Sequence, residues 1–442
     1  MPTTFKTIPG SVTAPKGFLA SGVFCDIKRI GTGKGSNKGR KRDLALIMSE
    51  VPAAVAGMFT TNQVCAAPVK VCAERVKKGL AQAIVINSGN ANACTGEQGL
   101  RDARRMTSLV AKQFSLPEEH VLVGSTGRIG VTMPMENVKS GILAAAALLG
   151  HGPEHAAEAA EAIMTSDTRA KQIAVEVTVG GQAVRIGGIC KGAGMIQPGM
   201  SATGQRPPAL PLHATMLCFI TSDAAIKPSP LRVALQEAVA KSFNRITVDG
   251  DMSTNDTVLA LTNGLAGNRP IASTSGRDFG NFQEALSYVT LELAKMIVRD
   301  GEGVSRFVTV RLNGARSQPQ ADIAARAVAN SALVKTSWCG GDPNWGRLID
   351  ALGYSAAEVV EKKVDIAYSP PGSRKRLYSL RHGRPTSTSF AALCKIAALP
   401  EFDLHIHLNL GKGSAVIYAA DLTEDYVDFN KGDVTDPSSL GG

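Results

Sequence analysis

Short apolar runs that end in clusters of small polar residues recur along this 442-residue chain. The runs LALIM (Leu44–Met48) and AIVIN (Ala83–Asn87) are typical of buried strands that stop at turn residues. Segments with helical periodicity separate such runs, and the pair Gly180-Gly181 predicts a hairpin turn. The pattern predicts helices over 99–114, 135–149, 153–164, 230–242 and 282–298, and strands over 173–179, 182–186, 307–312, 364–367, 404–409 and 414–420. We therefore expect an α/β fold.

The polar clusters are rich in glycine, serine, threonine and asparagine. Such residues at this density normally reduce stability, and after strands they are typical of functional sites. One cluster alone would be an ordinary turn, but their number favours an active site assembled from several loops. The clusters are NSGNANACTG (87–96), GSTGRIG (124–130), MTSDT (164–168), KGAGMI (191–196), ATMLCFITSDA (214–224), NRITVDGDMSTNDT (244–257), DGEG (300–303) and GGDPNWGR (340–347).

Composition excludes several classes of protein. With 44% hydrophobic and 19% charged residues the chain can bury a sizeable core, as a globular protein does. The longest small-apolar run, near 141–149, is too short to cross a bilayer, and the first residues lack the apolar core of a secretory signal. The 8 cysteines form no CxxC pair, so neither a disulfide framework nor a zinc site is expected. We expect a cytoplasmic protein that binds no membrane.

A basic, glycine-rich stretch, Lys28–Arg42, contributes much of the net charge of +10. Such a stretch can act as a nucleic-acid-binding arm. Aromatic residues make up only 5% of the chain and none interleaves these charges, so a solvated loop is the better interpretation. No GxxxxGK[ST] phosphate loop is present.

The polar clusters offer few nucleophiles. There is no GxSxG motif and the histidines lie outside the clusters, which argues against a serine–histidine–acid site. Cys94 and Cys339 have no histidine in their own clusters, and no HExxH or carboxylate–histidine grouping suggests a metal. A threonine remains. Its hydroxyl needs an adjacent base, which its own α-amine provides if the chain is cut just before it. That amine has a pKa of about 7.7–8.0.

Ala214-Thr215 suits such a cut. A small residue precedes Thr215, and the strand-forming run MLCFI follows it. The preceding segment, Ser201–His213, carries three prolines and one glycine, so it is expected to be an exposed loop.

The ordered motifs NSGNANACTG, STGxIG, KGxGMI, ATML, TVDGDxSTNDT, DGEG and DPNWGR closely resemble those of the ornithine acetyltransferase family, the bifunctional glutamate N-acetyltransferases of arginine biosynthesis. The resemblance covers nearly the whole chain. It implies mixed sheets sandwiched by helices and self-cleavage into an α chain (1–214) and a β chain (215–442) that stay intertwined. It also implies an α2β2 or larger assembly that needs no cofactor, with acetyl-coenzyme A as an additional donor in some members.

The resemblance also implies roles for particular residues. Thr215 is the nucleophile, and Thr126 with Gly127 forms the oxyanion hole. Lys191, Glu302, Asn430, Thr435 and a threonine of MTSDT bind substrate; we take the last as Thr165, with Thr168 as the rival. Each residue also has a structural alternative: Thr126 as a helix cap, Glu302 as a helix or turn cap, and Lys191 as a solvated lysine. We favour the functional role for these three residues, whereas for Thr165 the two interpretations are evenly balanced. The implied reaction moves an acetyl group from N-acetylornithine to glutamate through Thr215.

The chain departs from the family pattern in two places. The family runs from GMIxPxM directly into AT, whereas thirteen residues, Ser201–His213, intervene here. Near the end, Lys431, Gly432 and Asp433 replace the usual small, acidic and aromatic residues between Asn430 and Thr435. The acceptor is therefore open, and a threonine amidase or aminopeptidase that passes the acyl group to water is one alternative. A nucleic-acid-binding protein that uses Lys28–Arg42 is another.

Overall fold

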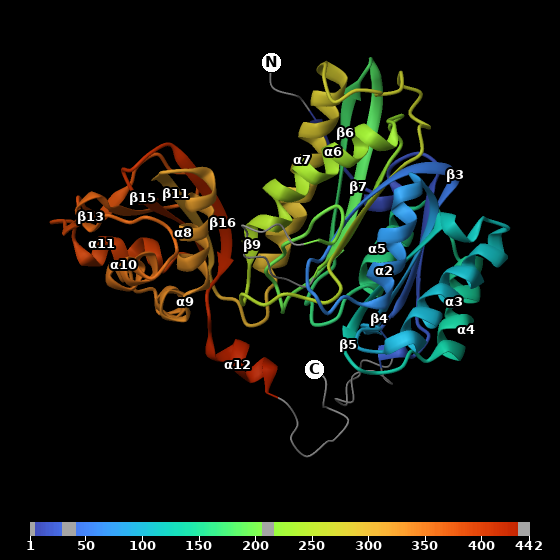
Figure 1. Ribbon diagram of the computed structural model, residues 1–442, viewed down its shortest axis with the longest axis horizontal. Coiled ribbons are helices and arrows are strands. Elements are labelled where there is room, and N and C mark those ends of the chain that lie inside the picture. The colour runs from blue at the N-terminus through green and yellow to red at the C-terminus, as the bar shows by residue number, and fades with distance from the viewer. Residues whose placement is uncertain (1–4, 29–40, 206–215, 432–442) are drawn as a thin grey trace.

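A computed structural model describes residues 5–28, 41–205 and 216–431, which form two lobes around two β-sheets (Figure 1). The larger sheet has nine strands in the order β1-β6-β7-β8-β10-β3-β4-β5, with β2 also paired to β3. We call this sheet and its helices the first lobe. Its strands are β1 (Phe5–Ile8), β2 (Phe18–Val23), β3 (Leu44–Phe59), β4 (Leu80–Asn90), β5 (Val121–Arg128), β6 (Lys171–Val179), β7 (Gln182–Lys191), β8 (Leu217–Ser222) and β10 (Thr257–Thr262).

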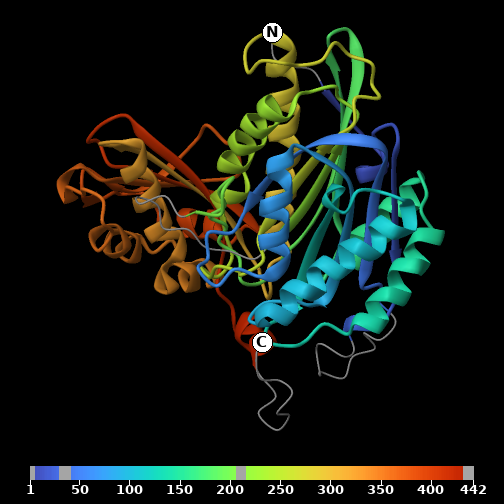
Figure 2. The same cartoon turned by 45° about the vertical axis from the view of Figure 1, so that its right-hand side comes forward.

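The long strand β3 belongs to both halves of this sheet. Its first part, from Leu44, pairs with β2 and β4, while its last part, up to Phe59, pairs with β10. In Figure 2 the blue ribbon of β3 arches from one half to the other. The halves then pack face to face, since a Cβ placed on Gly124 of β5 would lie 3.0 Å from the ring of Phe219 of β8. One folded sheet thus forms a two-layer sandwich.

Helices cover both outer faces of the sandwich. The β2–β5 half contacts α2 (Ala67–Arg75), α3 (Gly96–Phe114), α4 (Met135–Ala147) and α5 (Pro153–Ala162). The other half contacts α6 (Pro228–Lys241) and α7 (Arg277–Arg299). Alternation along β8 explains the layers: Phe219 joins the core between the halves, whereas Cys218 and Ile220 pack with residues of α6 and α7.

The second lobe is built on a seven-stranded sheet in the order β14-β13-β12-β15-β11-β16-β9, and it has a core of its own. Its strands are β9 (Ile246–Thr247), β11 (Phe307–Ala315), β12 (Asp365–Ser369), β13 (Leu377–Arg381), β14 (Arg384–Pro385), β15 (Glu401–His407) and β16 (Gly413–Ala420). Its helices are α8 (Gln318–Asn330), α9 (Ala332–Cys339), α10 (Trp345–Gly353) and α11 (Phe390–Ala397). After β16 the chain leaves this lobe and forms α12 (Glu424–Asn430) near the first lobe (Figure 1).

The predicted α/β class, with mixed sheets sandwiched by helices, is confirmed. So are the predicted helices and the hairpin, which the structure forms as β6 and β7 around Gly180-Gly181. The cluster GSTGRIG was predicted as a turn after a strand, and this is wrong, because Gly124–Arg128 belongs to β5 itself. Strand pairing with β4 holds these glycines in extended structure despite their weak strand propensity. Of the segment Ser201–His213, residues 206–213 lie outside the described residues; Ser201 pairs with Phe59.

Candidate active site

Three neighbouring strands of the first lobe end at one edge of the sheet. Lys191, the last residue of β7, pairs with Leu217, the first residue of β8, and Leu217 pairs on its other side with Thr257 of β10. Met216 immediately precedes β8, and its backbone N–H donates to the carboxylate oxygen Oδ1 of Asp256. Ala214, Thr215 and Thr435 lie outside the described residues. The residue after Thr215 is therefore held between the strand of Lys191 and the strand that follows Asp256.

Thr126 and Gly127 lie at the end of β5, in the other half of the sandwich. Gly127 has φ 130° and sits so close to β4 that a Cβ there would be 2.3 Å from the carbonyl carbon of Gly89, so no side chain fits. Asn255 links this region to β10, because its amide nitrogen donates to Ala91 O at 2.6 Å and to Ser125 O at 2.8 Å. The structure thus brings the predicted oxyanion residues next to the segment that leads into Asp256.

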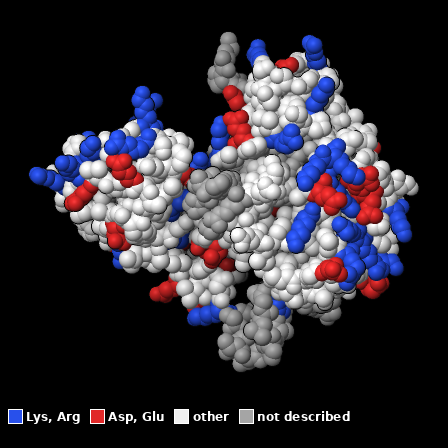
Figure 3. Space-filling view, viewed as in Figure 1, with Lys and Arg blue, Asp and Glu red and all other residues white. Residues whose placement is uncertain are grey.

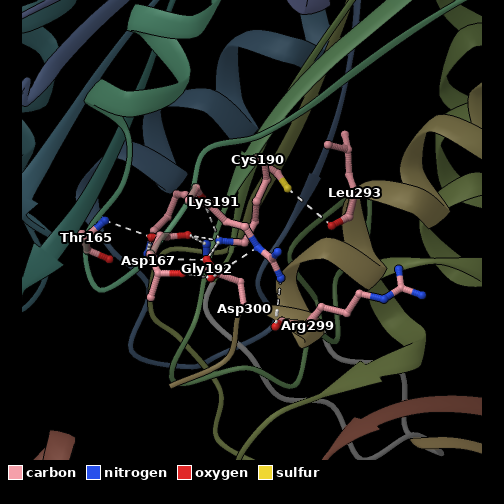
Figure 4. A network of polar contacts seen from close by, with 11 residues as sticks. Thr165, Asp167, Cys190, Lys191, Gly192, Leu293, Arg299 and Asp300 are labelled. Atoms are coloured by element: carbon pink, nitrogen blue, oxygen red, sulfur yellow. Dashed lines mark hydrogen bonds and ion pairs between the residues drawn. The ribbon is translucent and has the colours of Figure 1, made fainter. Parts of the chain in front are cut away.

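Asp167 is the centre of a buried network of charges (Figure 4). Its Oδ1 accepts from Lys171 Nζ at 2.6 Å and from the backbone N–H of Gly192 at 2.7 Å. Its Oδ2 accepts from the backbone N–H of Thr165 at 2.9 Å and lies 3.8 Å from Lys191 Nζ. One carboxylate therefore ties two predicted substrate-binding residues, Thr165 and Lys191, to each other.

Asp300 anchors this network from the end of α7. Lys171 Nζ, which bridges the two aspartates, donates to Asp300 Oδ2 at 2.5 Å. Thr168 donates to the same carboxylate through its hydroxyl and its backbone N–H. The hydroxyl of Thr165 makes no hydrogen bond with any described residue. Of the two threonines considered for substrate binding, Thr165 is the one whose hydroxyl is available to a ligand.

The network explains the protonation of its members. Burial by itself raises the pKa of Asp167, but the ammonium groups of Lys191 and Lys171 outweigh it and hold that pKa below its usual range. Burial lowers the pKa of Lys191, and Asp167 opposes that shift. For Lys171, burial also lowers the pKa, but Asp167 and Asp300 outweigh it and the net shift is upward. Lys191 is buried near Asp167, yet its ammonium makes no closer bond to it than 3.8 Å.

Glu302 and Asn430 meet beside the KGAGMI turn. The amide nitrogen of Asn430, at the end of α12, donates to Glu302 Oε2 at 3.0 Å. The backbone N–H of Glu302 donates to Ala193 O at 2.9 Å, and a Cβ on Gly194 would lie 2.3 Å from Glu302 Oε2. The charges of Glu302 and Asp256 both oppose the downward shift that burial gives the pKa of Lys191. Asn430 and Glu302 are thus hydrogen-bonded to each other, and Glu302 influences Lys191 electrostatically.

Six residues of this site have no individual role in the sequence prediction. Five lie within polar clusters identified above, namely Asp167, Asp249, Asn255, Asp256 and Asp300, whereas Lys171 lies outside them. Asp249 anchors the KGAGMI turn, since its carboxylate accepts from the backbone N–H groups of Met195 at 2.6 Å and Ile196 at 2.8 Å. The presence of an aspartate in such a cluster indicates a functional position. Its hydrogen-bond partners could not be predicted, because they are distant in the sequence.

The motif GGDPNWGR belongs to another region. Residues 342–346 line a pocket of about 360 Å³ whose remaining walls, including Thr386 and Phe390, also come from the second lobe. In the part of the chain that the structure describes, no group of three or more histidine, cysteine, aspartate or glutamate side chains is arranged to hold a metal ion. Nor does any described helix combine the length and apolarity that a membrane span requires.

The fold and the strand-end cluster define a mixed α/β protein with a polar site at the edge of a two-layer sheet. Comparison with related proteins shows the family to which the chain belongs. A model of the ArgJ family matches residues 24–433. The arginine biosynthesis bifunctional protein ArgJ of Symbiobacterium thermophilum is 47% identical over 96% of this chain and 98% of its own. The glutamate N-acetyltransferase of Methanocaldococcus jannaschii is 44% identical over 96% of this chain and 98% of its own.

Among solved structures, an ornithine acetyltransferase from Mycobacterium tuberculosis, in complex with ornithine, is 36% identical. It covers 45% of this chain and 100% of its own, with a TM-score of 0.40. The chain belongs to the ArgJ family, a family of acetyltransferase enzymes, and the resemblance seen in the sequence is confirmed.

Proposed function

We propose that this enzyme cleaves itself between Ala214 and Thr215 and then transfers an acetyl group from N-acetylornithine to glutamate. The observation that carries the proposal is the position of β8. This strand starts two residues after Thr215, and it lies between β7, which ends at Lys191, and β10, which begins just after Asp256. The proposed nucleophile is therefore bonded to a segment with a buried ionisable group on each side, Lys191 and Asp256.

The proposed mechanism has two half-reactions. The α-amine of Thr215 takes the hydroxyl proton as that oxygen attacks the acetyl carbonyl, and ornithine leaves. Thr126 and Gly127 donate to the oxyanion that forms, which is usually a large contribution to catalysis. Lys191 pairs with the substrate α-carboxylate, and Glu302 pairs with a cationic amine. Thr165, Asn430 and Thr435 complete the substrate contacts. Glutamate then removes the acetyl group from Thr215. The proposed reaction needs no cofactor, and the use of acetyl-coenzyme A as a second donor, as in some members of the family, is left open.

Cleavage would leave two chains, 1–214 and 215–442, that share one sheet. β8 and β10 come from the second chain, whereas their neighbours β7 and β3 come from the first. Separating the chains would break β-ladders on both sides of this pair, so we expect them to stay together as a heterodimer. We further expect two such heterodimers or more to assemble in the cytoplasm, which sedimentation with cell fractionation can test.

The proposal is tested with a denaturing gel, mass spectrometry and an acetyl-transfer assay. The wild-type protein should give two fragments, the second beginning at Thr215, and Thr215→Ala should remain one inactive chain. Cleavage of Thr215→Ala at the same bond would contradict the proposal. Release of ornithine from N-acetylornithine should depend on glutamate; release without it would favour the hydrolase alternative.

The nucleic-acid-binding alternative rests on Lys28–Arg42, and residues 29–40 of this stretch lie outside the described residues. One described face gives it no support. On the face in Figure 3, basic side chains alternate with acidic ones over α3 and α4. Arg101 lies 3.4 Å from Glu97, and Arg105 lies 3.8 Å from Glu136. A surface of mixed sign does not form the single basic stripe that tracks a phosphate backbone. Salt-dependent retention on DNA without any acetyl transfer would reverse this conclusion.

A further inference from the structure

Asp256 is a buried carboxyl group with one oxygen unused. Its side chain has 0% exposure. Its Oδ1 accepts the backbone N–H of Met216, while its Oδ2 has no hydrogen-bond partner among the described residues. Buried polar atoms without a partner are rare and costly in native proteins. Asp256 has such an oxygen and binds Met216, the second residue after the proposed scissile bond, so the unpartnered oxygen needs an explanation.

The surroundings of the Asp256 carboxyl group suit a proton donor. Burial raises the pKa of Asp256 well above its usual range, against the opposing influence of the Met216 N–H and of Lys191. Burial therefore favours the protonated form, in which one oxygen accepts from Met216 while the other offers an O–H. Lys191 is the charged group that would favour the carboxylate once this proton has left.

Covalent geometry limits the distance between the Thr215 nitrogen and the amide that Asp256 binds. The nitrogen of Thr215 is three bonds from the nitrogen of Met216, so the two nitrogens are at most about 4 Å apart. The Met216 nitrogen is in turn hydrogen-bonded to Asp256. The Asp256 carboxyl group is thus hydrogen-bonded to the amide that directly follows the Thr215 nitrogen in the chain.

We propose that Asp256 donates the proton that the nitrogen of Thr215 must gain when the chain cleaves itself. The inference rests on the proposed function. In the cleavage step a bond forms between the Thr215 hydroxyl oxygen and the carbonyl carbon of Ala214, and the bond from that carbon to the Thr215 nitrogen breaks. The nitrogen takes the Asp256 proton and becomes an amine, and the resulting carboxylate takes up the proton that the hydroxyl released. Water then hydrolyses the ester, leaving the Ala214 carboxylate and a free Thr215 hydroxyl.

The test is the rate of self-cleavage in newly made protein, followed on denaturing gels after cell-free synthesis. Asp256→Asn keeps an acceptor for Met216 and a donor at the second position but cannot release a proton. It should slow cleavage by roughly 10²-fold or more, the usual contribution of a general acid. Asp223→Asn is the matched control, because Asp223 is also a fully buried carboxyl that accepts backbone N–H groups, from Lys16 and Arg185, at the opposite end of β8. It should cleave at the wild-type rate.

The outcomes separate this inference from the proposed function. If the wild-type protein cleaves, Thr215→Ala does not, and Asp256→Asn cleaves at the wild-type rate, Asp256 is no proton donor although the function stands. If Asp256→Asn is fast but Asp256→Ala is slow, the residue only positions Met216, and the inference is again wrong. If the wild-type protein never cleaves, the proposed function itself fails. Thermal melting of each variant identifies any that does not fold.

Discussion

The two lobes bury polar groups in different ways. In the first lobe, the charged side chains of Asp167, Lys171 and Asp300 are nearly inaccessible and bond to one another at the ends of strands. In the second lobe, the large buried side chains include Trp338, Tyr368 and Phe402. A buried ion pair exists there too, since Arg326 and Asp322 are both nearly inaccessible, but the two residues lie one turn apart in the single helix α8. A second pair, Arg311 and Asp403, leaves the arginine side chain 37% exposed.

The first-lobe network differs in that it joins segments far apart in the chain and includes Lys191 and Thr165, two residues of the proposed site. Removing charges from water costs several kcal/mol per ion before pairing offsets it, so a buried charge network is weak evidence for stability. Its presence in the first lobe is better explained by the need to position Lys191 and Thr165. The second lobe is a packing unit whose chain, after β16, delivers α12 and with it Asn430 to Glu302. The second lobe thus contributes to the site by positioning Asn430 next to Glu302.

The largest expected effect comes from neutralising the centre of the network. Asp167→Asn would leave Lys171 and Lys191 buried with one partner fewer, which we expect to lower stability by roughly 3–5 kcal/mol. We also expect the KM for N-acetylornithine to rise, because Thr165 and Lys191 lose their common anchor. Asp403→Asn in the second lobe is the control, and it should lower stability without changing KM. Denaturant unfolding and steady-state kinetics measure both, and equal KM values in the two variants would contradict the contrast between the lobes.

The next effect concerns the oxyanion residues. Loss of one such donor typically lowers turnover by roughly 10²–10³-fold, and we expect this of Thr126→Ala, with little change in melting temperature. Thr290→Ala provides the comparison. It removes a buried hydroxyl that donates within α7 to Leu286 O and should leave turnover unchanged. A fully active Thr126→Ala enzyme would show that its hydroxyl is not a donor.

A pH effect should arise in the second lobe. Burial and the nearby Arg376 lower the pKa of His405 from 6.5 to about 4. Between these values the unfolded chain binds a proton that the folded protein does not, so His405 removes stability as the pH falls from 6.5 towards 4. The loss is at most about 3 kcal/mol. His405→Gln should make unfolding less sensitive to acid, and the exposed His407 provides a control in His407→Gln. Identical acid profiles for wild type and His405→Gln would exclude this contribution.

The smallest effect on stability is expected from deleting Ser201–His213. Loop closure entropy changes only slowly with length, by about 0.6 kcal/mol per doubling. The shortened chain, with Met200 joined to Ala214, should therefore fold. If the segment governs access, the deletion changes the cleavage rate or the preference among N-acetylated amines. An unfolded product would show that the segment belongs to the core, and His213→Ala tests separately whether that residue assists cleavage.

The sequence predicts what depends on local pattern. Apolar spacing is enough to identify α7 and the β6–β7 hairpin, and the order of the motifs is enough to identify the family. It does not reveal that β3 folds one sheet into two layers, because only its pairing with both β4 and β10 shows this. The role of Asp167 is hidden for a similar reason: Asp300, which shares Lys171 with it, lies more than a hundred residues away. Residue type indicates chemistry, but long-range pairing decides which residues meet.

The place of β8 inside the sheet also sets an order of events. Under the proposed cleavage, the reactive amine does not exist until the bond is cut, and the groups that flank the bond assemble only when β8 lies between β7 and β10. A chain that misfolds would carry no unmasked nucleophile, and the uncut fraction of a preparation would count the molecules that failed to fold. Self-cleavage would then occur only in correctly folded molecules, so the cleaved form would identify them.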